Sequence, residues 1–552
     1  MSWPKNSASF SPSPLFVGGI AILAVVAIFA IWFGTSTWGI GITPDSVAYI
    51  SGANSLLADG TLRVIEVEGK AAPLVHSAPL LSALLASISA IFHTTPQVSV
   101  VWLNAFCLAL TMALVGFTAA HFLKSNWISW LAALMTVSAL PMVSMHLRAL
   151  SEPPYLLFSL LALVLIAYHW ETPNIWLVVA AACAACLGIY TRYAGAALLG
   201  AGFLGVLFTP ARRTIERLRE TAAFALLSSL PFIAWLGRNY AVSGSATTAT
   251  ISTRHIITLA TIGDGINTLS SWLLPGSIPI ALRAAVAFAM AAIVIAGYRM
   301  SRSSRTQRNS AQALPVVMAL FILCHFALNV AAISFAYSDI PLDDRNLLPV
   351  LAPAVLILVW LWKQMEGSAG FGRVAWVSAT AMVFLMLATN VFRSVNEVRG
   401  AAASGRGYSS AQWRNAEVIR QLRALPRGVT VYTTLPSVFR YLTEHPARSL
   451  PEIYFDRTRL PNLNYQRDYN RMRDEARERG IAVVYGAQAP LRRFPEEQEV
   501  KQNLDLVFVT KDNFGSLHAS RSLLQNGSQN RAQNASQNTV AEQSPSQTSP
   551  AH

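Results

Sequence analysis

This chain is poor in charge, and that scarcity decides its broad class. Only 13% of its 552 residues are charged, whereas 53% are hydrophobic, and the mean hydropathy is +0.41. In a typical soluble domain, about a quarter of all residues are charged. The composition therefore excludes an ordinary soluble enzyme and predicts a polytopic α-helical membrane protein.

Cysteine is scarce as well, and no disulfide framework is expected from the four that lie in apolar runs, Cys107, Cys183, Cys186 and Cys324. The spacing Cys183-Ala-Ala-Cys186 is more typical here of small residues at a helix contact than of a redox or zinc site. Ten histidines are scattered without the spacing of zinc ligands. We therefore predict no cofactor and no metal ligand, and a divalent metal stays an unsupported alternative.

Long apolar runs fill most of the chain. A helix needs about 17–25 residues to cross a hydrocarbon core of about 30 Å. Eleven runs approach or reach that length, so we predict eleven transmembrane helices. They are Leu15–Phe33, Val98–Phe122, Trp127–Met145, Pro154–Trp170, Ile175–Tyr190, Tyr193–Phe208, Thr221–Leu236, Ile278–Tyr298, Leu314–Tyr337, Leu347–Trp362 and Val374–Phe392.

A twelfth apolar run, Pro79–Phe92, is too short to span comfortably. If it does not span and the N-terminus is cytoplasmic, the arginine-rich loops around Arg212 and Arg299 fall inside, as the positive-inside rule requires. We therefore predict a juxtamembrane helix on the outer surface. The same topology and anionic lipid headgroups explain the net charge of +14, so no nucleic acid partner is predicted.

The last part of the chain differs in composition from the apolar runs. Residues 400–522 alternate helical and strand patterns, which predicts a small, partly parallel α/β domain outside the membrane. No glycine-rich phosphate loop accompanies it, so no nucleotide site is expected. The predicted organisation is a transmembrane module over 1–395, this outer domain over 400–522 and a disordered tail over 523–552.

Polar clusters lie at the outer ends of the predicted spans. Asp45, just after the first span, is an ionised acid at a membrane face, which favours a functional role. Alternatively, Asp45 or Ser46 caps a short surface helix that continues through Ala58. The other clusters are Arg148–Pro154, Tyr190–Gly195, Arg238–Gly244 and Asp339–Pro349.

Asp45 and Glu152 share this outer face with several arginines. A carboxylate can take the proton of a hydroxyl, while guanidinium groups hold a phosphate through paired hydrogen bonds. The combination suits a reaction with a hydroxyl nucleophile and a phosphate leaving group. For any one arginine the alternative is a side chain that only reaches the membrane interface.

The series of motifs resembles the GT-C superfamily of polyprenyl-phosphate-dependent glycosyltransferases, in the branch of the protein O-mannosyltransferases and the lipid A aminoarabinose transferase. The motifs in order are Thr43-Pro-Asp-Ser-Val-Ala-Tyr49, His76-Ser-Ala-Pro-Leu80, Ser151-Glu-Pro153, Thr191-Arg-Tyr-Ala-Gly195, Arg238-Asn-Tyr240 and Asp344-Arg-Asn-Leu-Leu-Pro349. Three departures leave the acceptor and any metal open. Ser46 stands where a second acid is common, Ser77 and Ala78 break the His-Pro-Pro element, and Glu152 replaces an aspartate.

The resemblance implies an inverting transfer of a sugar from a polyprenyl-phosphate donor to a hydroxyl acceptor. Asp45 would be the general base, Glu152 would orient the acceptor or sugar, and Arg192 and Arg345 would contact the phosphate. Tyr49, His76, Arg238 and Asp344 complete the expected substrate-binding set. The expected partners are the lipid-linked donor, membrane lipids and a lipid, glycan or protein acceptor, at the extracytoplasmic side of the inner or plasma membrane.

Two other functions fit some of these features. A lipid-linked sugar flippase or transporter would use the same charges along a translocation path, but it predicts internal repeats and acids near mid-membrane, which the sequence does not suggest. A polysaccharide polymerase or ligase shares the lipid-linked substrate, but we expect it to carry a large outer loop between spans. In this chain the large outer segment follows the last span.

Overall fold

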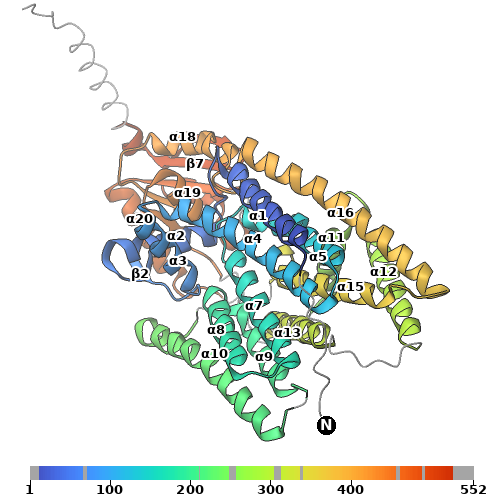
Figure 1. Ribbon diagram of the computed structural model, residues 1–552. Helices are drawn as coiled ribbons and strands as arrows, with labels where there is room; N and C mark the ends of the chain where they lie inside the picture. The colour runs from blue at the N-terminus through green and yellow to red at the C-terminus, as the bar shows by residue number, and fades with distance from the viewer. Residues whose placement is uncertain are drawn as a thin grey trace, which may run out of the picture. The chain divides into compact units, whose positions relative to one another are not determined.

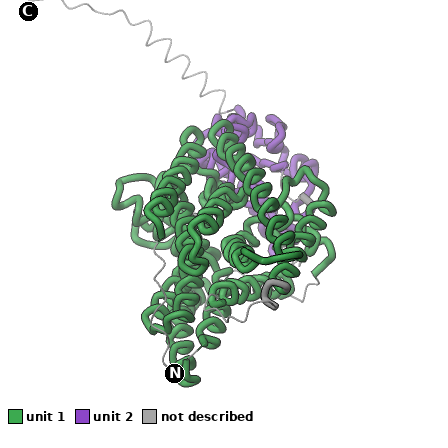
Figure 2. The backbone as a smooth tube through the Cα atoms, turned by 45° about the vertical axis from the view of Figure 1, so that its right-hand side comes forward, with its two compact units in different colours: residues 1–64, 73–407 green, residues 65–72, 408–552 purple. Residues whose placement is uncertain are grey.

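The computed structural model describes residues 12–65, 71–210, 212–247, 257–303, 312–335, 340–454, 461–487 and 491–525. The chain forms two compact units, coloured separately in Figure 2: residues 1–64 with 73–407, and residues 65–72 with 408–552. Asp339 and the part of the predicted tail from 526 onward lie outside the described residues. The described residues of this region reach Gln525, and Leu523 among them is buried.

The first unit is built from helices (Figure 1), most of which contribute to one large apolar core. Serine or threonine caps α1, α2 and α4, and proline follows each cap, which is the favoured start of a helix. The helices are α1 (Pro14–Thr35), α2 (Pro44–Asp59), α3 (Leu80–Phe92), α4 (Pro96–Leu123), α5 (Asn126–Ser138), α6 (Leu140–His146), α7 (Glu152–Glu171), α8 (Ile175–Thr191), α9 (Ala196–Leu207), α10 (Thr214–Ser243), α11 (Leu259–Leu273), α12 (Ile280–Ser303), α13 (Ala313–Phe335), α14 (Asp344–Leu347), α15 (Leu351–Met365) and α16 (Phe371–Ser404).

All eleven predicted spans coincide with helices over most of their described residues, which confirms the predicted fold class. Among the described helices, eight are long and apolar enough to cross a membrane, or nine if the bent pair α5 and α6 is one span. Helices α8 and α9 are the shorter ones, with 17 and 12 residues. Figure 1 shows α8, α9 and α10 side by side, and α12, α15 and α16 packed together.

Three details differ from the sequence prediction. The run Trp127–Met145 is not one straight helix, because it bends by 52° between α5 and α6, and α6 begins at Leu140 with Pro141 in its first turn. Helix α10 extends well beyond Thr221–Leu236 at both ends. Helix α11 was not predicted, since its apolar residues are too mixed with polar ones to resemble a span. The short helix predicted at Pro79–Phe92 is present as α3.

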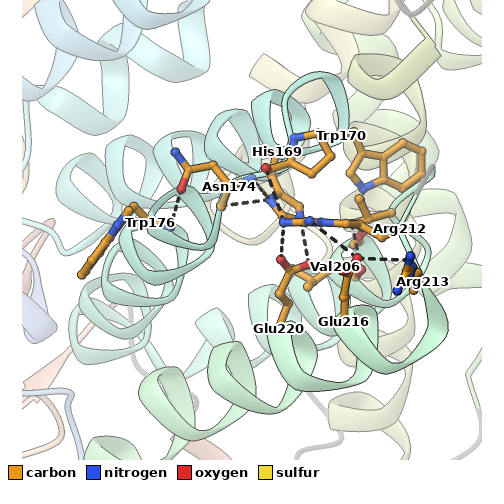
Figure 3. Close-up of polar contacts among 12 residues, drawn as sticks. His169, Trp170, Asn174, Trp176, Val206, Arg212, Arg213, Glu216 and Glu220 are labelled. Atoms are coloured by element: carbon orange, nitrogen blue, oxygen red, sulfur yellow. Dashed lines mark hydrogen bonds and ion pairs between the residues drawn. The ribbon is translucent and has the colours of Figure 1, made fainter. Parts of the chain in front are cut away.

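A polar cluster in the first unit joins the helix ends opposite to Asp45 (Figure 3). The His169 Nε2 near the end of α7 lies 3.3 Å from the Glu220 carboxylate of α10, and Arg212 donates to the same carboxylate at 2.8 Å. His169 Nδ1 also lies 3.0 Å from the carbonyl oxygen of Asn174, the cap of α8. The cluster ties α7, α8 and α10 together, and α7 and α8 carry Glu152 and Arg192 at their other ends.

The second unit contains a five-stranded sheet in the order β4-β3-β5-β7-β6. Strands β4 (Ala447–Ser449), β3 (Thr430–Thr433) and β5 (Ile481–Gly486) are parallel, whereas β7 (Gly515–Ser520) and β6 (Leu506–Asp512) run antiparallel to their neighbours. The sheet is therefore partly parallel, as predicted. Its helices are α17 (Ala411–Arg414), α18 (Glu417–Arg423), α19 (Pro436–Thr443), α20 (Tyr465–Glu478) and α21 (Glu497–Asn503).

One helix cap and one strand of this unit did not follow from the sequence. Helix α19 begins at Pro436, and Leu435 occupies its cap position. Strand β7 gave no sequence signal, since Gly515–Ser520 has small residues where β-branched ones would mark a strand. The sheet buries Tyr432, whose hydroxyl donates to Glu475 at 3.1 Å.

Candidate functional site

The loop after α1 is paired with the loop between α6 and α7. The Gly41 amide donates to the Leu147 carbonyl at 3.0 Å, and the Ala149 amide donates to the Gly41 carbonyl at 2.9 Å. A Cβ at Gly41 would lie 3.0 Å from that Leu147 oxygen, so the close approach requires glycine. The Asn104 side chain donates to the carbonyls of His146 and Arg148 and holds the second loop in place. This pairing brings the start of α2 close to the start of α7.

Asp45 lies in the first turn of α2 but does not cap it. The cap is Thr43, whose hydroxyl accepts from the Ser46 amide, while the Ser46 hydroxyl accepts from the Thr43 amide. The predicted alternative, in which Asp45 or Ser46 is the helix cap, is therefore wrong, although Ser46 takes part in the capping box. Asp45 Oδ2 instead accepts a hydrogen bond of 2.5 Å from Arg345 Nη2.

Glu152 is the first residue of α7, and its side chain is only 1% exposed. Its Oε1 pairs with both Arg345 Nε and Arg192 Nη1. Its Oε2 is buried and has no hydrogen-bond partner among the described residues. A buried carboxylate is tolerated only with a counter-charge, and here two guanidinium groups supply it. Asp45, Glu152, Arg192 and Arg345 therefore form one ionic network at one end of the helical unit.

Electrostatics in the network keep Asp45 ionised. Burial raises the pKa of the Asp45 carboxyl, but the charge and the hydrogen bond of Arg345, together with the charges of His76 and Arg192, lower it by more. The pKa of Asp45 therefore lies below its ordinary value of 3.8. One turn further along α2, burial and the neighbouring Asp45 raise the pKa of the Tyr49 phenol above 10.0.

Tyr49 and Arg238, which were predicted to bind substrate, make contacts within the protein. The Tyr49 hydroxyl donates to Ser151 Oγ at 3.1 Å, and the side chain is buried, so it links α2 to the residue before Glu152. Arg238 donates to the Leu74 carbonyl at 3.0 Å and stacks over Trp235, which places it against the segment ahead of His76 and outside the ionic network.

His76 lies in a segment that Tyr193 also holds. The Tyr193 hydroxyl donates to the Val75 carbonyl at 3.1 Å and accepts from Trp235 Nε1 at 3.1 Å. The charge of His76 acts on Asp45, as described above. His76 therefore lies near the network, and Tyr193, supported by Trp235 of α10, holds the backbone just ahead of it.

Asp344 is next to Arg345 in sequence but has a different partner. Its Oδ1 accepts a hydrogen bond of 2.7 Å from Trp272 Nε1 of α11. The preceding Asp343 caps α14 by accepting from the Asn346 amide at 3.0 Å. Trp272 and Asn104 also support the site, and no motif in the sequence marked them, because each acts through partners that are distant in the chain.

The donor set of the network does not fit a divalent cation. No group of three histidine, cysteine or acidic side chains in the described part of the chain could hold a metal ion. Both acids of the network face guanidinium groups, which would repel a cation from the same oxygens. We therefore assign no chemical step to a metal.

The chain matches the family model of dolichyl-phosphate-mannose-protein mannosyltransferases over residues 78–238. Its fold is similar to that of ArnT from Cupriavidus metallidurans in the apo state, with a TM-score of 0.57 and 12% identity over 91% of this chain and 98% of ArnT. ArnT bound to undecaprenyl phosphate is similar too, with a TM-score of 0.54 and 13% identity over 91% and 98% of the two chains. The oligosaccharyltransferase of Archaeoglobus fulgidus in complex with Zn and sulfate is similar with a TM-score of 0.52 and 11% identity, over 85% of this chain and 68% of the oligosaccharyltransferase chain.

These similarities confirm the resemblance to GT-C glycosyltransferases that the motifs indicated. Because the sequence identity to the solved structures is so low, the structural similarities concern the fold alone. No curated protein matches this chain significantly in sequence. The matched range 78–238 includes Glu152, Arg192 and Arg238 but neither Asp45 nor Arg345.

Proposed function

We propose that this protein is an integral membrane glycosyltransferase, which transfers one sugar from a polyprenyl-phosphate carrier to a hydroxyl acceptor with inversion. The ionic network is the observation that carries the proposal. It combines two guanidinium groups, suited to an oxyanion, with a carboxylate that stays ionised at neutral pH. ArnT, whose fold this chain shares, has a structure with undecaprenyl phosphate bound, which supports a carrier of that class.

The reaction follows from the chemistry of these groups. The acceptor oxygen attacks the anomeric carbon from the face opposite to the phosphate, and the proton of the hydroxyl passes to Asp45. The bond between the anomeric carbon and the phosphate oxygen breaks, and its electron pair stays on the polyprenyl phosphate. Arg345 and Arg192 stabilise the negative charge that grows on that phosphate. The attack from the opposite face inverts the anomeric configuration.

The site is proposed to face the extracytoplasmic side. Two loops at the opposite ends of these helices are basic: 209–213 contains Arg212 and Arg213, and 363–373 contains Lys363 and Arg373 against one acid, Glu366. Basic loops favour the cytoplasm. A lipid-linked donor suits such a site because it reaches the protein laterally through the bilayer. The acceptor class is a hydroxyl on a lipid, a glycan or a protein.

A donor screen tests this proposal. Purified protein in liposomes is incubated with radiolabelled polyprenyl-phosphate sugars and an extract of acceptors, and label is expected to leave the carrier for an acceptor. Glu366→Gln, which changes a half-exposed ion pair with Lys363 at the opposite helix ends, serves as a control and should transfer label as the wild type does. Movement of intact lipid-linked sugar across the vesicle, without transfer, would contradict the proposal and support a flippase.

A further inference from the structure

Arg345 is shared by two acids that differ sharply in exposure. Its Nη2 donates to Asp45, and its Nε donates to Glu152. The side chains of Arg345 and Asp45 are 32% and 33% exposed, whereas that of Glu152 is 1% exposed. A ligand that approaches Arg345 from the open side therefore meets the contact with Asp45 first, and the contact with Glu152 lies behind the guanidinium group.

The contact between Glu152 and Arg345 is held in place by several neighbouring interactions. Glu152 begins α7, and the same oxygen that accepts from Arg345 also pairs with Arg192, whose side chain is 13% exposed. The preceding Ser151 is fixed by the hydroxyl of the buried Tyr49. Moving Glu152 away would leave a charge buried without a partner, which is costly. Asp45 has no comparable constraint, because its carboxylate is already partly in contact with water.

We propose that Asp45 occupies the place of the donor phosphate on Arg345. When the donor binds, its phosphate displaces Asp45 from Arg345 Nη2, while Glu152 stays hydrogen-bonded to Arg345 Nε. This exchange frees Asp45 to act as the base. The inference rests on the proposed function. Carboxylate and phosphate oxygens compete for the same guanidinium hydrogens, because both are anionic acceptors of matching geometry. Glu152 is then a positioning residue, which aligns Arg192 and Arg345, and the donor binds before the acceptor is activated.

The exchange predicts that substitutions of Asp45 and of Glu152 change the affinity for the carrier in opposite directions. Loss of the Asp45 charge removes a competitor of the phosphate, so binding of the carrier should become tighter. Loss of the Glu152 charge removes the group that aligns both arginines, so binding should become weaker. A model in which both acids contact only the acceptor or sugar predicts no effect of either on binding of a sugar-free carrier.

Binding of undecaprenyl phosphate to purified protein in detergent, followed by intrinsic tryptophan fluorescence, tests the inference. Compared with the wild type, Asp45→Asn and Asp45→Ala should bind about two- to fivefold more tightly, the scale of a partly exposed ion pair. Glu152→Gln should bind at least about tenfold more weakly, since it loses the charge that aligns both guanidinium groups. Asp59→Asn, an exposed acid at the end of the same helix α2, should bind as the wild type does.

Unchanged or weaker binding by both Asp45 variants overturns the inference, even if Glu152→Gln does not fold. If the wild type binds undecaprenyl phosphate and the Asp45 variants do not bind it more tightly, the exchange is wrong and the proposed function stands. If the wild type does not bind undecaprenyl phosphate at all, the proposed function fails and the exchange fails with it.

Discussion

Asp45→Asn is expected to lower the rate of sugar transfer by about 10²–10⁴-fold, the usual loss when a general base is removed. Asparagine keeps the size of the side chain and can still accept a hydrogen bond from Arg345, but it cannot take the proton of the acceptor hydroxyl. The fold should not suffer, because Thr43 and Ser46 cap α2 and Asp45 does not. Initial rates of transfer from a saturating labelled donor measure the effect.

The matched control is Asp59→Asn, which removes another acid from α2 at a site that is 50% exposed and 3.9 Å from Arg63. It should transfer sugar at the rate of the wild type. If Asp45→Asn also keeps a rate close to that of the wild type while binding the carrier, Asp45 does not act as the base, and the acid that takes the proton is another group.

Glu152→Gln is expected to have the largest effect on stability. It removes a buried negative charge and leaves Arg192 and Arg345 with one counter-charge fewer. Breaking a buried ion pair in this way typically costs about 3–5 kcal/mol, and the lower end applies here because Arg345 is partly exposed. The melting temperature in one detergent, at one scan rate, should therefore fall clearly below that of the wild type.

Glu366→Gln provides the comparison for this loss. The Lys363–Glu366 pair is 30% and 39% exposed, and such pairs contribute about 1 kcal/mol or less. Equal melting temperatures for Glu152→Gln and Glu366→Gln would show that the network at Glu152 adds little to stability, and that water replaces the lost carboxylate.

The sequence was sufficient to place the acids and arginines at one end of the helices. Because spans alternate in direction, Asp45 after the first, Glu152 before the fourth, Arg192 after the fifth and Arg345 before the tenth must share one face. Their contacts in the ionic network bear out that part of the analysis. The hydrophobic pattern contains this information, since it determines how often the chain crosses.

The sequence could not predict which side chains on that face lie beside one another. Arg238 and Asp344 are on the same face as Asp45, yet Arg238 binds the Leu74 carbonyl and Asp344 binds Trp272. Which helices pack beside one another depends on the shapes of many buried side chains and not on the hydropathy of any one helix. The same limit applies to Glu152: the sequence predicted a role in orienting the acceptor or sugar, but it could not show that the carboxylate pairs with both Arg192 and Arg345.

The most direct test of the account is an experimental structure of the protein with undecaprenyl phosphate bound. The account predicts the phosphate within hydrogen-bond distance of Arg345 and Arg192, with Glu152 still paired to Arg345 Nε and with Asp45 separated from Nη2. A phosphate held by another cation, such as Arg238, beside an intact contact between Asp45 and Arg345 would contradict it.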